Sequence, residues 1–290
     1  MSNERDIADQ ISQIADQRRE KLRLDLEKGT TPPFITQIIQ TETSYVIHPN
    51  GLPYAQSDLD KFSASLKELY GLTPVRDDVQ SNDPLSKILG QRSSDALEYK
   101  NGRFKVSSHD LIQIKFVRLT SERIHVVLGG SGAAAEVIIA DIVERLWASA
   151  GVSKPWADLS KLVQARQYGT GTEVDLGFPL KRLLSPQFEK LIEAKFLAEG
   201  GFAREMAPKR NQQVAGRTSD VLVGYVVDEI KLLFTIVDTR SGVSERPQLR
   251  ISVGNVTHYG TSNCIVISEL RYEDHVKCVA ALIESFSGDV

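Results

Sequence analysis

The sequence predicts an α+β protein with two related antiparallel-sheet-plus-helix units that follow an N-terminal helical arm. The main observation is a pattern of strand, turn, strand and helix that occurs twice, over residues 112–148 and again over residues 249–286. In each copy the strand segments alternate between apolar and polar residues or are short apolar runs, and apolar residues at helical spacing follow. The predicted organisation is an arm over residues 1–30, a first unit over 31–150 and a second over 151–290, packed as one domain or two.

Composition places the chain among ordinary globular proteins. Of its residues 41% are hydrophobic and 25% are charged, and the formal net charge of -3 favours neither nucleic acid nor acidic membranes as a partner. The two cysteines, Cys264 and Cys278, are expected to be reduced thiols. No apolar run reaches the length of about 18 residues that a membrane span needs, and no signal peptide is recognisable. We therefore predict a cytoplasmic protein.

The predicted arm is an amphipathic helix over residues 4–28. Ile7, Ile11, Ile14 and Leu22 lie near one stripe, which Arg18 interrupts. Two interpretations remain open for this helix: it packs on its own domain, or it joins copies of the chain. Self-association through residues 4–28 is the predicted partner interaction.

The first unit is expected to begin with a strand or a bent strand pair over residues 34–47 and a helix over 58–70, capped by Ser57 and ended by Gly71. Asn101-Gly102 is the preferred pair for a type I′ turn, which predicts a hairpin of residues 97–100 and 103–106. With the hairpin of residues 112–128, this gives a four-stranded meander beneath the helix of residues 134–148.

The second unit is expected to start within an irregular boundary over residues 149–172, because Gly169 and Gly171 break the periodicity there. Ser185-Pro186 is typical of a helix start. The segments 221–227 and 230–237 are almost wholly apolar, which predicts two central strands.

A glycine-rich turn between the second strand and the helix of the first unit is a candidate ligand site. Gly130, Ser131 and Gly132 bring exposed amides to a helix start, where a phosphate group can bind. A tight structural turn explains the same glycines. The corresponding hypothesis is a sensor of a nucleotide or another phosphate compound.

Four residues form a candidate catalytic set. Glu189 lies on a predicted helix, Asp220 opens a strand, and Asp238 and Arg240 follow a strongly apolar segment. This order resembles the restriction-endonuclease-like nuclease core, with Arg240 where that family has lysine. The resemblance implies a divalent-metal-dependent nuclease in which Asp220 and Asp238 hold Mg²⁺; an arginine stays protonated and does not act as a base.

A basic segment supplies a candidate nucleic-acid contact. Arg204, Lys209, Arg210 and Arg217 are opposed only by Glu205. Such cations contact phosphates, although no aromatic residue is interleaved to stack bases.

These observations leave three hypotheses. The leading one is a cytoplasmic, non-catalytic interaction or regulatory component that self-associates and needs no cofactor. The alternatives are the nuclease-like domain with Mg²⁺ and the phosphate-ligand sensor.

Overall fold

The computed structural model describes residues 13–24, 31–49, 51–75, 96–105, 111–130, 132–178, 180–192, 229–233, 236–237, 244–245, 248–253 and 262–287. Its helices are α2 (Leu59–Tyr70), α4 (Gly132–Ser149), α5 (Trp156–Leu159), α6 (Pro186–Ile192) and α8 (Tyr272–Ser287), with 3-10 turns η1 (Tyr54–Gln56), η2 (Ser160–Leu162) and η3 (Leu180–Leu183). Residues 13–24 form a further helical segment. The strands are β1 (Ile35–Ile47), β2 (Thr73–Pro74), β3 (Leu97–Lys105), β4 (Leu111–Leu119), β5 (Arg123–Leu128), β6 (Val163–Asp175), β7 (Glu229–Leu233), β8 (Ile236–Val237), β9 (Ser244–Glu245), β10 (Gln248–Val253) and β11 (Asn263–Ser268).

Nine strands form one antiparallel sheet in the order β2-β3-β4-β5-β1-β6-β11-β10-β7, and β8 pairs with β9 separately. The two longest strands, β1 and β6, have 13 residues each and lie side by side near the middle of the sheet. Each of them also pairs with the last strand of its own unit, β1 with β5 and β6 with β11. The predicted α+β class is therefore confirmed, and one continuous sheet runs through both units.

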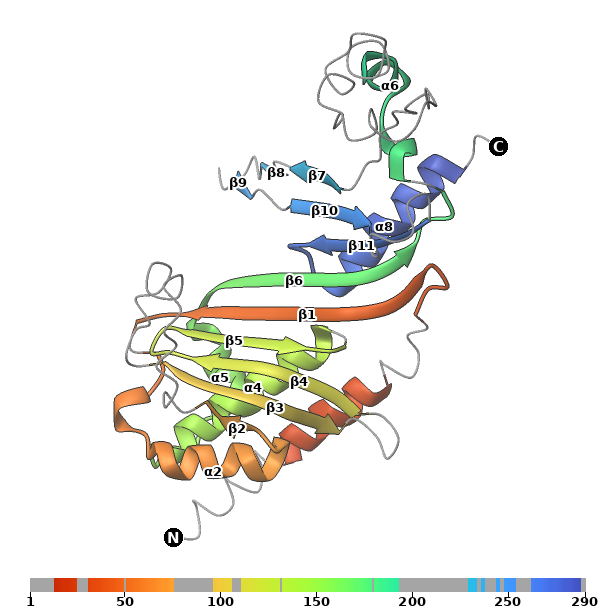
Figure 1. Ribbon diagram of the computed structural model, residues 1–290. Helices are drawn as coiled ribbons and strands as arrows, with labels where there is room; N and C mark the ends of the chain where they lie inside the picture. The colour runs from red at the N-terminus through yellow and green to blue at the C-terminus, as the bar shows by residue number, and fades with distance from the viewer. Residues whose placement is uncertain are drawn as a thin grey trace, which may run out of the picture.

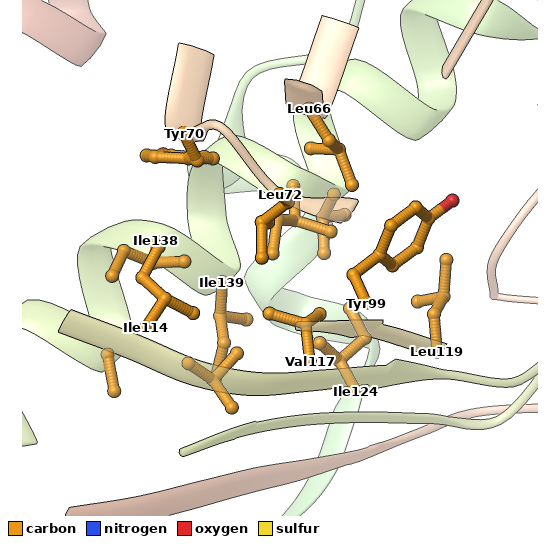
Figure 2. Packing of buried hydrophobic residues seen from close by; sticks show 14 of the residues in the cluster. Leu66, Tyr70, Leu72, Tyr99, Ile114, Val117, Leu119, Ile124, Ile138 and Ile139 are labelled. Atoms are coloured by element: carbon orange, nitrogen blue, oxygen red, sulfur yellow. The ribbon is translucent and has the colours of Figure 1, made fainter. Parts of the chain in front are cut away.

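Helices cover one face of this sheet (Figure 1). α4 contacts β1 and β5, α2 contacts α4, and α8 contacts β6. Beneath α2 and α4 the sheet contributes Tyr99, Ile114, Val117 and Ile124 to the first core, which Figure 2 shows from close by. A second core lies between α8 and strands β6, β10 and β11. The opposite side of the sheet is called the open face below.

The two strand–helix units have matching registers. Thr41 and Thr170 occupy equivalent places, because they lie opposite Leu128 of β5 and Ser268 of β11, the last residues of those strands. By the same count Thr43 is equivalent to Thr172. The Thr41 hydroxyl donates to the Gly130 carbonyl, and the Thr170 hydroxyl donates to the Leu270 carbonyl over 2.8 Å.

The helices α4 and α8 begin at the same distance from these threonine hydrogen bonds. α4 begins two residues after Gly130, and α8 begins two residues after Leu270. Ala135 and His275 are therefore both the fourth residue of their helix, and Glu144 and Glu284 are both the thirteenth. These matches define equivalent positions; that the two units are related stays a prediction.

The helical segment of residues 13–24 packs on α4 of the same chain. Arg18 Nη2 donates to both carboxylate oxygens of Glu144 over 2.6 and 2.8 Å, and Arg19 Nη2 donates to Asp141 Oδ2 over 2.7 Å. Leu22 belongs to the first core. Arg18, which interrupts the apolar stripe of the sequence, thus faces a buried acid. Self-association through residues 4–28 stays a prediction, because these contacts concern only part of that range.

α2 begins one residue later than its predicted cap suggests. Asp58 caps the helix, since its carboxylate accepts from the Lys61 amide over 3.0 Å. Ser57 instead donates its hydroxyl to the carbonyls of Pro53 and Leu146. Gly71 ends the helix with a φ of 65°, a left-handed conformation that glycine adopts without strain.

The Asn101-Gly102 hairpin prediction is wrong. β3 runs straight through both residues and pairs with β4, and Asn101 takes a φ of 60° within the strand. The glycine meets a packing requirement: a Cβ on Gly102 would lie 2.7 Å from Leu72 Cδ2. The residue pair therefore combines a left-handed asparagine with a close contact to the chain after α2.

Two further strand predictions need correction. The stretch 149–172, predicted as an irregular boundary, contains most of β6, one of the longest strands. The segment 230–237 is predicted to be one covered central strand, yet it contributes to two short strands, β7 and β8, and Glu229 and Lys231 of β7 are exposed. Residues 221–227 lie outside the described residues.

Candidate functional site

The open face of the first unit carries a concentration of cations. Strands β3, β4 and β5 contain six lysines and arginines and one acid, Glu98. We call these cations the basic face: Lys100, Arg103, Lys105, Lys115, Arg118 and Arg123. Because the whole chain has a net charge of -3, this is a local feature that the overall composition conceals.

The alternation of strand residues places these cations opposite the helices. Tyr99, Phe104, Val117 and Ile124 are buried in the first core, while the cations next to them along the strands are exposed or half-buried. At Lys115 a bulge shifts the register between β4 and β5. Gly129 follows the buried Leu128, so a Cβ on Gly129 would point to the open face. Such a Cβ would lie 3.6 Å from Gln113 Cβ and 3.7 Å from Lys115 Cε, which places the Lys115 side chain on the open face as well.

Among the described residues, few acids pair with the cations of the basic face. Arg118 Nε lies 3.6 Å from Glu98 Oε1, and Lys115 Nζ donates to the Ile39 carbonyl over 2.8 Å. Lys100, Arg103, Lys105 and Arg123 make no ion pair with the part of the chain that the structure describes. Exposed cations that outnumber their acidic neighbours create a positive potential that attracts anions.

One aromatic ring lies among these cations. Phe116 is half-buried on β4, with Lys100 of β3 and Val127 of β5 opposite it in the register. The His125 ring packs edge-on against Phe116, with centroids 6.1 Å apart. A side-chain hydrogen bond from His125 holds the pKa of the half-buried Glu42 carboxyl below its ordinary value.

The middle of the open face is hollowed. A cavity of about 1120 Å³ lies over β1, β5, β6 and β11. Its floor contains two glycines of β6, Gly169 and Gly171, and its apolar lining includes Ile39, Ile265 and Ile267. Ile267 lies directly opposite Gly171 within the sheet, and its side chain is 44% exposed. We call this cavity the hollow.

A second, smaller pocket lies on the helix side, where the N-termini of α4 and α8 approach β1 and β6. Its volume is about 130 Å³, and Gly132, Thr43 and Arg271 contribute to its lining. The Thr43 hydroxyl is buried and has no hydrogen-bond partner among the described residues. Arg271 Nη2 donates to Glu136 Oε1 over 3.0 Å, which links the start of α8 to α4. The lining also includes Glu42, Glu136 and Glu273, and this acidic surplus disfavours an anion there.

A buried serine–histidine pair in the second unit has a structural role. His275 Nδ1 lies 2.7 Å from Ser268 Oγ, and its Nε2 lies 2.7 Å from Thr172 Oγ1. Burial lowers the pKa of His275 to about 4, so the ring is neutral near pH 7. All three side chains are almost fully buried, which is typical of a hydrogen-bonded polar network inside a core.

The sequence-predicted site residues fall mostly outside the described part of the chain. This applies to Asp220, Asp238 and Arg240 of the nuclease-like set, to all four cations Arg204, Lys209, Arg210 and Arg217, and to Ser131. Glu189 belongs to α6. The Gly130 carbonyl accepts the Thr41 bond, and Gly132 begins α4 and lines the small pocket. The nuclease-like site and the phosphate site therefore stay predictions.

The basic face was missed by the sequence analysis, although a signal for it existed. Every cation of β3, β4 and β5 stands beside a core residue, as the alternation of a half-buried strand requires. Counting charge on the polar side of each predicted strand, rather than over the chain, reveals the surplus.

Within the described ranges, no three histidine, cysteine or acidic side chains gather as a metal site, and no helix has the length and apolar character to cross a bilayer. The chain matches no protein-family model, no curated protein and no solved structure.

Proposed function

We propose that this protein is a non-catalytic interaction component that self-associates, with the hollow of the open face as the contact between copies. The observation that carries this proposal is the pair of glycines in β6. Glycine in a strand interior is less favourable than alanine by about 0.5–1 kcal/mol. It often marks a place where another backbone approaches closely.

Packing against the residues that the structure describes does not require these glycines. A Cβ on Gly169 would meet its nearest neighbour, Glu42 Cβ, at 3.4 Å, and one on Gly171 would meet Gln40 Cγ at 3.7 Å. Both distances are ordinary contacts, in contrast to the 2.7 Å approach at Gly102. The absence of side chains at positions 169 and 171 therefore leaves room for another backbone at this surface.

Apolar exposure and symmetry support a second copy as that partner. Ile267 extends from β11 beside Gly171, so an apolar group stands next to a flat strip of backbone. The hollow lies over β1 and β6, where equivalent strands of the two units meet. A two-fold axis through such a surface brings Ile267 of one copy onto the glycines of the other, an isologous contact.

The test is the mass in solution, measured by light scattering after size exclusion. We expect the wild-type chain to be a dimer or larger, and Ile267→Arg to be a monomer, because it buries a charge in the contact. Leu111→Arg is the matched control, since Leu111 is 59% exposed on β4 away from the hollow; it should keep the wild-type mass.

A wild-type monomer at all concentrations contradicts the proposal, and so does an Ile267→Arg variant that keeps its mass. Deletion of residues 1–12 tests the predicted arm separately, because it leaves Arg18, Arg19 and Leu22 on α4. Dissociation after this deletion, with Ile267→Arg unchanged, would move the contact from the hollow to the arm.

A further inference from the structure

We propose that the basic face binds single-stranded nucleic acid, with its cations on phosphates and Phe116 as a stacking platform for a base. Of its six cations only Arg123 also lines the hollow, and the inference does not require self-association.

Charge complementarity is the first argument. Strands β3, β4 and β5 have six cations against one acid, whereas the corresponding strands β7, β10 and β11 have two cations against one acid. In the second unit Arg250 Nη2 is paired with Glu229 Oε2 at 2.7 Å. The surplus is therefore particular to the first unit and is not a general property of this sheet.

The spread of the cations favours a polymer over a small anion. They occupy three adjacent strands, which are spaced about 4.8 Å apart, and residues two positions apart on a strand, such as Arg103 and Lys105, are separated by about 6.7 Å. A single phosphate group cannot meet cations distributed over such an area. A chain of phosphates meets them in succession, and each contact releases counterions.

Shape and aromatic content favour a single strand. Reading a duplex requires a helix or ribbon that enters a groove, whereas the basic face is one side of a sheet. Single strands bind surfaces that combine cations with aromatic side chains, on which bases stack whatever their identity. Phe116 lies between Lys100 and Val127 in the register and supplies such a ring. An acidic peptide would use the cations but not the ring.

The experiment measures fluorescence anisotropy of a labelled 20-nucleotide oligothymidylate with the full-length protein from 50 to 200 mM salt. Engagement of all six cations predicts a slope of log K against log salt of about -4, from about 0.7 per phosphate contact. The variant Arg103→Glu/Lys105→Glu should reduce that slope by about 1.4 and weaken binding at least about tenfold at 50 mM salt. Phe116→Leu should weaken binding at least about fivefold with the slope unchanged.

The control is Lys231→Glu, a single charge reversal at an exposed position of β7, which is compared with Arg103→Glu alone as well as with the double variant. It should leave the affinity within about twofold. The monomeric Ile267→Arg variant is measured in parallel, so loss of self-association and loss of nucleic-acid binding are separated.

Three results would overturn the inference: no anisotropy change at 50 mM salt, an equal loss with Lys231→Glu, or competition by polyglutamate as strong as that by unlabelled oligothymidylate. The last result would assign the surface to acidic proteins. A thermal melt of each variant confirms that a loss of binding does not reflect unfolding.

Discussion

Thr43 of β1 and Thr172 of β6 occupy the same place in the two units, yet their hydroxyls have different surroundings. Thr172 Oγ1 lies 2.7 Å from His275 Nε2, the fourth residue of α8. At that place in α4 the chain has Ala135, and the buried Thr43 hydroxyl finds no partner in the part of the chain that the structure describes. One backbone arrangement thus holds a satisfied polar network in one unit and an orphaned hydroxyl in the other.

The long helices α4 and α8 show the opposite difference, because here the first unit has the buried polar residues with partners. On α4, Asp141 is 3% and Glu144 is 6% exposed, because residues 13–24 cover them with Arg18 and Arg19. On α8, the equivalent Ala281 and Glu284 are exposed. The comparison teaches that the first unit places its buried charge between helices, whereas the second places its buried polar network between helix and sheet.

The largest effect is expected from breaking the charge pair on α4. Glu144→Ala leaves the Arg18 guanidinium without its bidentate acceptor and the Trp156 amide without its 2.7 Å bond to Glu144 Oε1. Removing one partner of a buried pair costs about 3–5 kcal/mol. Glu284→Ala, the matched change on exposed α8, should alter the free energy of unfolding by less than about 0.5 kcal/mol. Urea denaturation measures both, and equal losses would contradict the comparison.

The Arg18–Glu144 pair also separates what the sequence predicts from what it does not. The repeated strand–helix pattern was predictable because strand alternation and helical periodicity depend on residues that are close in the sequence. The strands β4, β5, β10 and β11 each begin within one residue of their predicted starts. Arg18 and Glu144, in contrast, are 126 positions apart. The charge in the apolar stripe signalled a partner, but only the fold identifies it.

Glycine produced the main errors in the predicted fold. Gly102 was assigned to a turn and Gly171 to a boundary, yet both lie within strands. Glycine provides either backbone freedom or space, and the sequence does not show which of the two a position needs. The basic face was hidden for a related reason. Its cations lie in three separate segments, and only strand pairing brings them onto one surface.

A pH-dependent effect of intermediate size is expected in the second unit. His275 has a pKa of about 4 in the folded protein and 6.5 as the ordinary value. Between these values the unfolded chain binds a proton that the folded chain does not, so stability falls as the pH is lowered from about 6.5 towards 4. The loss amounts to about 3 kcal/mol.

Urea unfolding from pH 4.5 to 7.5 measures this effect. His275→Gln should flatten the wild-type profile over that window, even if it lowers stability at pH 7. The exposed His48→Gln serves as the control and should reproduce the wild-type slope. A His275→Gln profile parallel to wild type would refute a neutral buried imidazole.

The smallest effect, and the most direct test of the comparison, comes from the two threonines. Thr172→Val removes the partner of a buried imidazole nitrogen, which costs about 1–3 kcal/mol because that nitrogen stays desolvated. Thr43→Val replaces an unpartnered buried hydroxyl with a methyl group of the same shape, so stability should be unchanged or should rise slightly. Urea midpoints of the two variants, measured at pH 7, decide the matter. Equal destabilisation would mean that Thr43 has a partner after all, and that the two units treat their matched hydroxyls alike.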